Sequence, residues 1–334
     1  MNPALQALIT ITVGVGGCVG YFWLSNLVLD RVLFPARGPQ AGRNITRANM
    51  IRPWLFLFPA LVALAVYLAY PVVATAWLSL HRDAGGAREF AGLDNYARMM
   101  AEPKFWESMR NNLLWLVVVP ALSTAFGLLA AQLTDRIGWG NLAKSLIFMP
   151  MAISFVGASV IWKLIYDARP AGQDQIGILN ALYLWAGGDA PQQWLQIPFW
   201  NSLFLMAVLV WIQAGFAMVI LSAALRAIPE ETVEAAILDG ANPLQIFFRI
   251  KVPQIRGTIV VVWTTITITV LKVFDIVLAM TNGQWETQVL ANYMYDKFFR
   301  AFDVGVGSAA AMVIMALVTP ILVWNVRNAR REMQ

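Results

Sequence analysis

The sequence predicts an all-α membrane protein with about seven transmembrane helices. Of its 334 residues, 59% are hydrophobic and only 13% are charged, and the mean hydropathy is +0.62. Soluble domains carry about a quarter charged residues, so this chain has too little polar surface to cover a globule. Its apolar runs are long and lack the alternating polar residues of a membrane β-barrel, which favours helices.

Composition also excludes several classes of function. One histidine and one cysteine cannot build a zinc, haem or iron–sulfur centre, so we expect no metal site. The basic residues are scattered over loops, which argues against nucleic-acid binding. No lysine follows a glycine, so the chain has no phosphate-binding loop of an ATPase, and no catalytic set is clustered in it. A membrane enzyme is therefore the least favoured function, and we expect a protein that is not an enzyme.

The candidate spans follow the chain in order. Four of them contain no charged residue: residues 7–29, 54–80, 111–134 and 304–326. A fifth, at 145–166, carries only Lys163 near one end, where the side chain can extend to the interface. The uncharged stretch 190–225 is too long for one span, and Pro198 predicts that its helix begins near Phe199.

The remaining span covers residues 257–281 and contains Lys272 and Asp275. These two residues stand three apart, which predicts a neutralising pair on one helical face. The short apolar stretch 176–185 cannot cross a bilayer and is predicted to lie in the outer interface.

Orientation and domain organisation follow from the positive charges. With the N-terminus outside, most loop arginines and lysines lie on the cytoplasmic side, led by the run Arg31, Arg37, Arg43, Arg47 and Arg52. We expect the N-terminus outside and the C-terminus inside. Residues 1–53 are interpreted as an anchor helix with a basic cytoplasmic loop, and residues 54–334 as the core.

The cytoplasmic segment 226–256 is the most informative part of the sequence. Pro229 and two glutamates predict the first turn of a helix, which Gly240 then ends. Pro243 predicts the start of a second short helix over 243–250, which ends before Pro253. Such a helical hairpin is either a docking element for another protein or an amphipathic hairpin on the inner leaflet.

The spacing of Glu234-Ala235-Ala236, Gly240, Ile250 and Val252-Pro253 resembles the EAA loop of ABC importer permeases. The residues Trp211, Gly215, Phe274-Asp275 and Met280-Thr281-Asn282-Gly283 extend the likeness, which runs from residue 54 to the C-terminus. It is strongest to the maltose-type sugar permeases, and among them to alpha-glucoside permeases. Val252 departs from the family's leucine, and Gln284-Trp285 replaces a frequent Gly-Pro.

The resemblance implies an ATP-driven importer of sugars, with alpha-glucosides or other oligosaccharides favoured, in a bacterial inner membrane. Its implied partners are a second homologous permease, two ATPase subunits and a periplasmic sugar-binding protein. ATP and magnesium would be bound by the ATPases, and this chain would bind no cofactor. The residues implied in coupling to the ATPases are Glu234, Ala235, Ala236, Asp239, Gly240, Phe247, Phe248, Ile250 and Pro253.

The resemblance also places sugar contacts in the middle of the fifth and sixth helices of the permease. The corresponding substrate-path candidates are Leu209, Trp211, Gln213, Phe216, Ile266, Thr269, Val270, Val273 and Asp275. Several are apolar, so the partner permease is an alternative carrier of the polar half of the site. Threonines near Trp263 could bind sugar hydroxyls or bond back to their own helix.

A secondary transporter driven by an ion gradient is the alternative function. Such proteins place ion-binding groups at the midplane and usually contain inverted repeats. This sequence has one charged pair, away from the centre of its span, and no visible repeat, so the importer is favoured.

Overall fold

The computed structural model describes residues 3–38, 40–84, 87–135 and 137–332. It forms two compact units, residues 1–74 and 75–334, whereas the predicted organisation divides the chain between residues 53 and 54. Within these described residues, five helices are long and apolar enough to cross a membrane, or up to seven if each of two bent helix pairs is one span. These numbers agree with the predicted fold class.

The N-terminal unit contains two long helices. α1 covers Pro3–Leu27 and continues as a π-helical turn, Val28–Leu33, and α2 covers Ala41–Leu64 before a second such turn, Ala65–Ala69. α2 thus begins inside the loop predicted between residues 30 and 53. Alanines and arginines there are good helix formers, and arginine side chains can reach water from a helix end.

A proline explains one contact between these two helices. Pro59 has no N–H and therefore leaves the carbonyl of Leu55 without its helical donor. The Tyr21 hydroxyl of α1 donates to that carbonyl at 2.8 Å. Arg52 of α2 also pairs with Asp30 at 2.6 Å.

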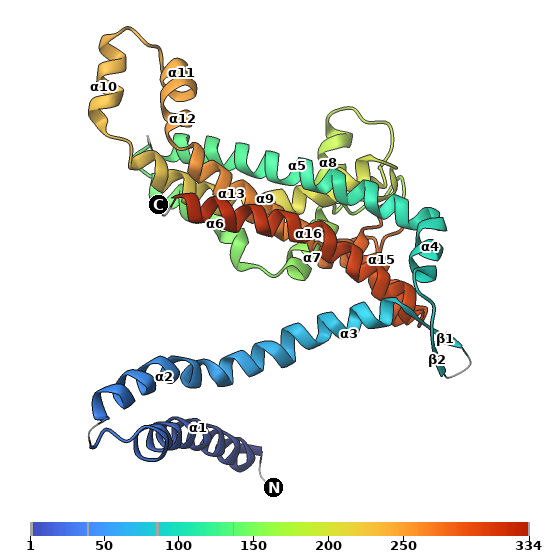
Figure 1. The fold of residues 1–334 in the computed structure, drawn as a ribbon. Coiled ribbons are helices and arrows are strands. Elements are labelled where there is room, and N and C mark those ends of the chain that lie inside the picture. The colour runs from blue at the N-terminus through green and yellow to red at the C-terminus, as the bar shows by residue number, and fades with distance from the viewer. Residues whose placement is uncertain (1–2, 39, 85–86, 136, 333–334) are drawn as a thin grey trace. The chain divides into compact units, whose positions relative to one another are not determined.

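The second unit begins with α3 (Tyr70–Ser79, which starts in the first unit), a β-hairpin and α4 (Asp94–Ala101). The hairpin pairs β1 (His81–Ala84) with β2 (Ala87–Phe90) in antiparallel register, His81 opposite Phe90. Sequence analysis did not predict it. The helical bundle follows, with α5 (Pro103–Thr134), α9 (Trp200–Arg226), α13 (Arg256–Leu271) and α16 (Val304–Glu332) running side by side (Figure 1).

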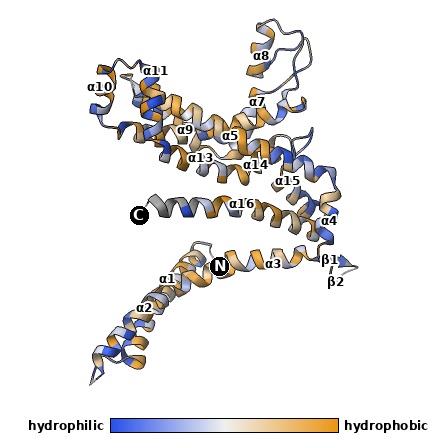
Figure 2. Ribbon diagram, turned by 45° about the horizontal axis from the view of Figure 1, so that its top comes forward, coloured by the Kyte–Doolittle hydropathy of each residue, from blue (hydrophilic) through white to orange (hydrophobic). Residues whose placement is uncertain are grey.

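The helix α9 forms the centre of the hydrophobic core and packs most extensively against α5. Glycine permits the close approach of these helices, because a Cβ on Gly127 would lie only 2.4 Å from that of Ala217. The predicted start of this span is confirmed, with Phe199 as the residue before the helix. Figure 2 shows that apolar residues dominate the bundle helices.

The predicted span 145–166 is not one continuous helix. The chain forms α6 (Gly140–Phe148), a 3₁₀ turn (Met149–Ala152) and α7 (Phe155–Ile165), and α6 and α7 meet at 106°. Pro150 lies in the 3₁₀ turn and cannot supply an α-helical N–H. The Ser154 side chain then accepts the Gly157 N–H at 3.1 Å and caps a new helix.

The predicted single helix over 257–281 is also wrong, and so is the Lys272–Asp275 pair on one face. α13 ends at Leu271, and α14 covers Asp275–Met280. Asp275 stands in the first turn of α14, where the helix dipole favours an acid. Both side chains are exposed, and no ion pair joins them in the described structure.

The outer segments consist of short elements. α8 covers Ile178–Trp185 and confirms the predicted short helix, and a 3₁₀ turn, Trp194–Gln196, follows. α15 (Leu290–Tyr295) and a π-helical turn (Asp296–Arg300) precede α16.

Candidate functional site

The segment 226–256 forms a helical hairpin that projects from one end of the bundle (Figure 1). Its first arm is α10, Glu230–Leu238, with Pro229 before it and both glutamates in its first turn as predicted. Its second arm is a continuous run of α11 (Pro243–Gln245), a π-helical turn (Ile246–Lys251) and α12 (Val252–Gln254).

Gly240 makes the turn between the arms. Its φ of +81° lies in the left-handed region, which glycine adopts without strain. The N–H of Ala241 bonds to the carbonyl of Ala236 at 3.0 Å, as in a Schellman cap. The predicted break at this position is confirmed.

The second arm begins with a capping box that sequence analysis missed. The Gln245 N–H donates to Asn242 Oδ1, and the Asn242 N–H donates to Gln245 Oε1, both at 2.9 Å. An asparagine followed three residues later by glutamine is the signal that could have revealed it. The predicted end of this arm before Pro253 is wrong, because the helical run continues through Pro253 to Gln254, and the fixed φ of proline, about −65°, is itself helical.

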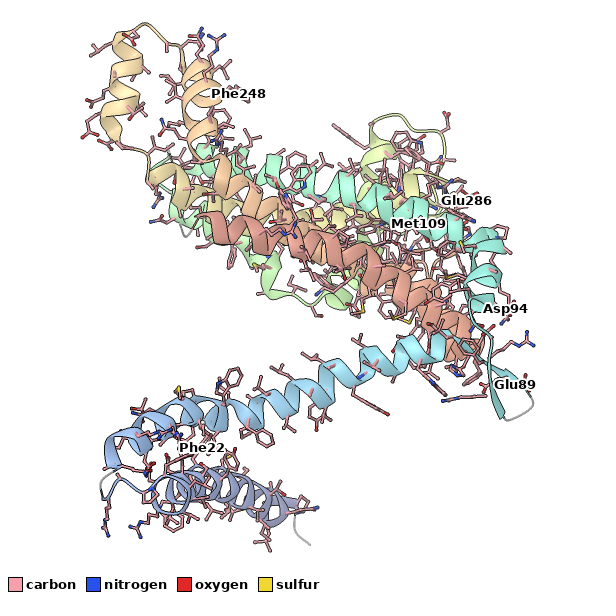
Figure 3. The ribbon with its side chains drawn as sticks, in the orientation of Figure 1. Phe22, Glu89, Asp94, Met109, Phe248 and Glu286 are labelled. Atoms are coloured by element: carbon pink, nitrogen blue, oxygen red, sulfur yellow. The ribbon has the colours of Figure 1, made fainter. Side chains whose placement is uncertain are left out.

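The hairpin leaves large apolar side chains exposed. Ala236 and Ile246 are buried between the arms, whereas Leu238 and Leu244 are 88% and 69% exposed. Phe248 is 63% exposed, and Phe247 is half-buried, with its ring nearly perpendicular to that of Phe248 in a T-shaped contact. Figure 3 shows Phe248 on the second arm, away from the bundle.

The other predicted coupling residues lie along the same hairpin. Glu234, Ala235, Asp239 and Pro253 are exposed, and Ile250 is half-buried. The structure therefore brings all nine predicted positions into one projecting element, with acids on the first arm and aromatic rings on the second.

The predicted substrate path is mostly closed in this structure. Five of its nine residues are buried in the packing around α9 and α13: Leu209, Gln213, Ile266, Val270 and Val273. Trp211, Phe216 and Thr269 are half-buried, and Asp275 is exposed at the start of α14. The structure thus gathers the candidates on neighbouring helices without opening a polar cavity between them.

The threonines of α13 are engaged within their own helix. Thr264, Thr265, Thr267 and Thr269 each donate to a backbone carbonyl three or four residues earlier, at 2.8–3.2 Å. This favours back-bonding over sugar binding for these hydroxyls in the conformation described.

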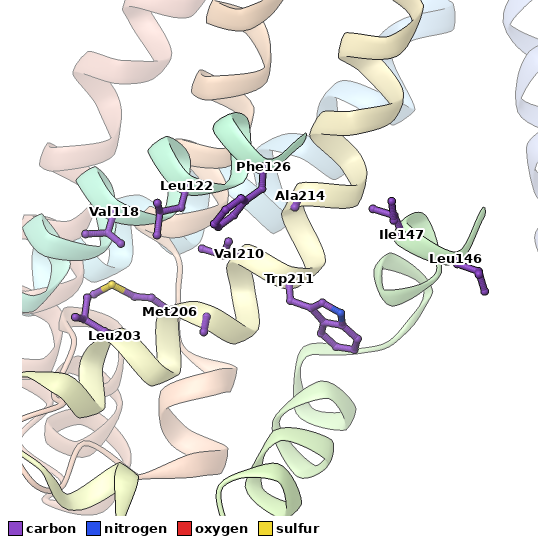
Figure 4. Close-up of a pocket in the computed structure, with 11 residues that line it drawn as sticks. Val118, Leu122, Phe126, Leu146, Ile147, Leu203, Met206, Val210, Trp211 and Ala214 are labelled. Atoms are coloured by element: carbon purple, nitrogen blue, oxygen red, sulfur yellow. The ribbon is translucent and has the colours of Figure 1, made fainter. Parts of the chain in front are cut away.

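An apolar cavity of about 650 Å³ lies between α5, α6 and α9 (Figure 4). Trp211 is the one substrate-path candidate that lines it, beside Phe126, Ile147 and other apolar residues. No charged or hydrogen-bonding side chain except that indole faces it, so the cavity suits hydrocarbon rather than a sugar.

The sequence that forms this bundle matches a known protein family. Residues 116–333 match the family of binding-protein-dependent transport system inner membrane components. The chain belongs to this family. It is therefore an inner-membrane subunit of an ABC importer and not an enzyme, which confirms the resemblance seen in the sequence.

Two importer permeases are similar to this chain over most of its length. The chain is 63% identical to the alpha-glucoside transport system permease protein AglF of Rhizobium meliloti, over 99% of both chains. It is 46% identical to the osmoprotective compounds uptake permease protein GgtC of Synechocystis, over 83% of this chain and 99% of the relative.

A solved structure supports the fold of the importer permease. A chain of the bacterial alginate ABC transporter, in complex with a pentasaccharide-bound periplasmic protein, superposes with a TM-score of 0.72. The match covers 88% of this chain and 99% of that one at 20% identity, so it bears on the fold alone.

Proposed function

We propose that this permease subunit carries alpha-glucosides across the bacterial inner membrane. The observation that supports this substrate class is the 63% identity over nearly the whole chain with a permease named for alpha-glucoside transport. Its partners would be a second homologous permease, two ATPase subunits and a periplasmic sugar-binding protein. ATP and magnesium would be bound by the ATPases, with no cofactor on this chain.

In this proposal the 226–256 hairpin docks on an ATPase subunit. Leu238, Leu244 and Phe248 supply an exposed apolar surface. Proteins rarely expose such a surface to water unless a partner covers it. Glu234 and Asp239 of the first arm are available to basic groups of the ATPase. The capping box and the Gly240 turn stiffen the hairpin, so that a displacement of the ATPase can move the bundle.

The substrate and the energy source can be tested together. Uptake of a radiolabelled alpha-glucoside into a permease-deletion strain should be restored by this chain with its partner subunits. Unlabelled alpha-glucosides should compete, and beta-glucosides should not. An ATPase subunit that binds but does not hydrolyse ATP should abolish uptake, whereas dissipating the ion gradient at constant ATP should not. The opposite pattern would indicate the secondary transporter.

We further infer that the N-terminus lies outside and the C-terminus inside, because the arginine run between residues 31 and 52 favours the cytoplasm. The test uses single cysteines at Gln40 and Phe90 in a Cys18→Ala background. A membrane-impermeant thiol reagent should label Phe90→Cys in spheroplasts and Gln40→Cys only after the inner membrane is opened. Labelling in the reverse order would overturn this topology.

A further inference from the structure

A cluster of charges lies where three helices of the second unit end or begin. Asp135 directly follows α5 and accepts hydrogen bonds from Arg226 Nε and Nη2 at 3.0 and 2.8 Å. Lys144 of α6 also donates to this carboxylate and, at 2.8 Å, to the hydroxyl of Ser222. The Ser222 hydroxyl donates in turn to Asp135 at 3.1 Å.

The members of this cluster are partly removed from water. The side chains of Asp135 and Lys144 are 19% and 15% exposed, whereas Arg226 is 61% exposed. Burial alone would raise the pKa of the Asp135 carboxyl, but the hydrogen bonds from Lys144, Arg226 and Ser222 outweigh it and lower that pKa. One ionised carboxylate therefore holds two cations from different helices.

The position of Arg226 connects this cluster to the hairpin. Arg226 is the last residue of α9, so the first arm of the hairpin starts only a few residues beyond it. Lys144 belongs to α6, the first half of the bent α6–α7 pair. The far end of α6 lies against α9, since a Cβ on Gly215 would be only 2.5 Å from the Ile147 carbonyl oxygen.

We propose that Asp135 is a positioning residue that passes movement of the hairpin to α6 and thereby to the bent α6–α7 pair. This inference rests on the proposed docking of the hairpin on an ATPase. A displacement of the α9 end pulls Arg226, and the shared carboxylate carries that displacement to Lys144. Without the carboxylate, two cations face each other at short range, and at this end of α9 only the Lys144–Ser222 hydrogen bond still joins α6 to the helix that leads into the hairpin.

The test measures sugar uptake per ATP hydrolysed by the complete transporter in proteoliposomes. Asp135→Asn should lower this ratio about fivefold or more, a typical allosteric coupling, while the ATPase subunits still copurify. Arg226→Gln should lower it less, since Ser222 of α9 still bonds to Asp135 and Lys144, and Asp135→Glu should restore most of it. Adding Arg226→Gln to Asp135→Asn should cause little further loss, because both changes remove the same link.

The exposed ion pair Arg110–Glu286 provides the matched control, with 3.3 Å between Arg110 Nη2 and Glu286 Oε2. Arg110→Gln removes an ion pair of the same type and should leave the ratio unchanged. A wild-type ratio for Asp135→Asn, or an equal loss in Arg110→Gln, would overturn the inference. If the Asp135→Asn permease fails to insert into the membrane, the uptake-to-hydrolysis ratio of Arg226→Gln is the test instead, because the Arg226 side chain is largely exposed. Failure of the wild-type chain to copurify with an ATPase would instead refute the docking proposal.

Discussion

Valine at Gly240 should leave the permease inserted in the membrane but lower sugar uptake about tenfold or more. The φ of +81° at this position places a β-branched residue in a conformation that costs about 1–2 kcal/mol. A Cβ there would meet no atom within 4 Å, so the effect comes from the backbone and not from a clash. The arms of the hairpin would reorient, and ATP hydrolysis would no longer drive transport.

Gly240→Asn is the matched control, because asparagine visits the left-handed region more readily than other residues. It should retain most uptake, although it adds a larger side chain than a methyl group. Uptake and ATP hydrolysis are measured side by side in the same vesicles. Normal uptake by a stably expressed Gly240→Val permease would show that the turn is not needed for coupling.

Truncation of Phe248 to alanine should weaken the complex with the ATPase subunits about thirtyfold, equivalent to about 2 kcal/mol. Phe248 and Leu244 stand four residues apart on the second arm and are both exposed, so they form one apolar face. The family resemblance implies both Phe247 and Phe248 in coupling, but the ring of Phe247 is half-buried in the described structure. We therefore expect the larger loss from Phe248.

The measurement is the recovery of the ATPase subunits with tagged permease at several salt concentrations, since an apolar anchor should be insensitive to salt. Phe90→Ala is the control, because Phe90 is 72% exposed in the hairpin β1–β2, far from the 226–256 segment of the same unit (Figure 1). Recovery of the ATPases at wild-type levels from Phe248→Ala would favour the alternative that the hairpin rests on lipid.

Local chemistry made much of this structure predictable. Span lengths follow from apolar runs that match the thickness of a bilayer, and the Gly240 turn follows from a glycine between two helix-forming segments. The capping box is equally local, because Asn242 and Gln245 stand only three residues apart. Such signals act within one helical turn, so neighbouring residues are sufficient to read them.

The substrate path was less predictable. Alignment on a family pattern placed its residues on α9 and on the segment from α13 to the start of α14, but whether each side chain faces a cavity or the core depends on the neighbouring helices. Thr269 could have bound a ligand, yet in this structure its hydroxyl bonds to Thr265. The apolar cavity beside Trp211 is formed by three helices, so no single segment predicts it.

The sequence by itself determined that the chain enters the membrane, where its long helices lie and which cytoplasmic segment carries the hairpin, because hydropathy, prolines and glycines act locally. Only the tertiary structure decided the break after Leu271 and the cluster at Asp135. Asp135 and Arg226 are far apart along the chain, and their pairing exists because α5 and α9 pack closely through Gly127. Contacts of this kind depend on the shape of a packed interface, which no local pattern encodes.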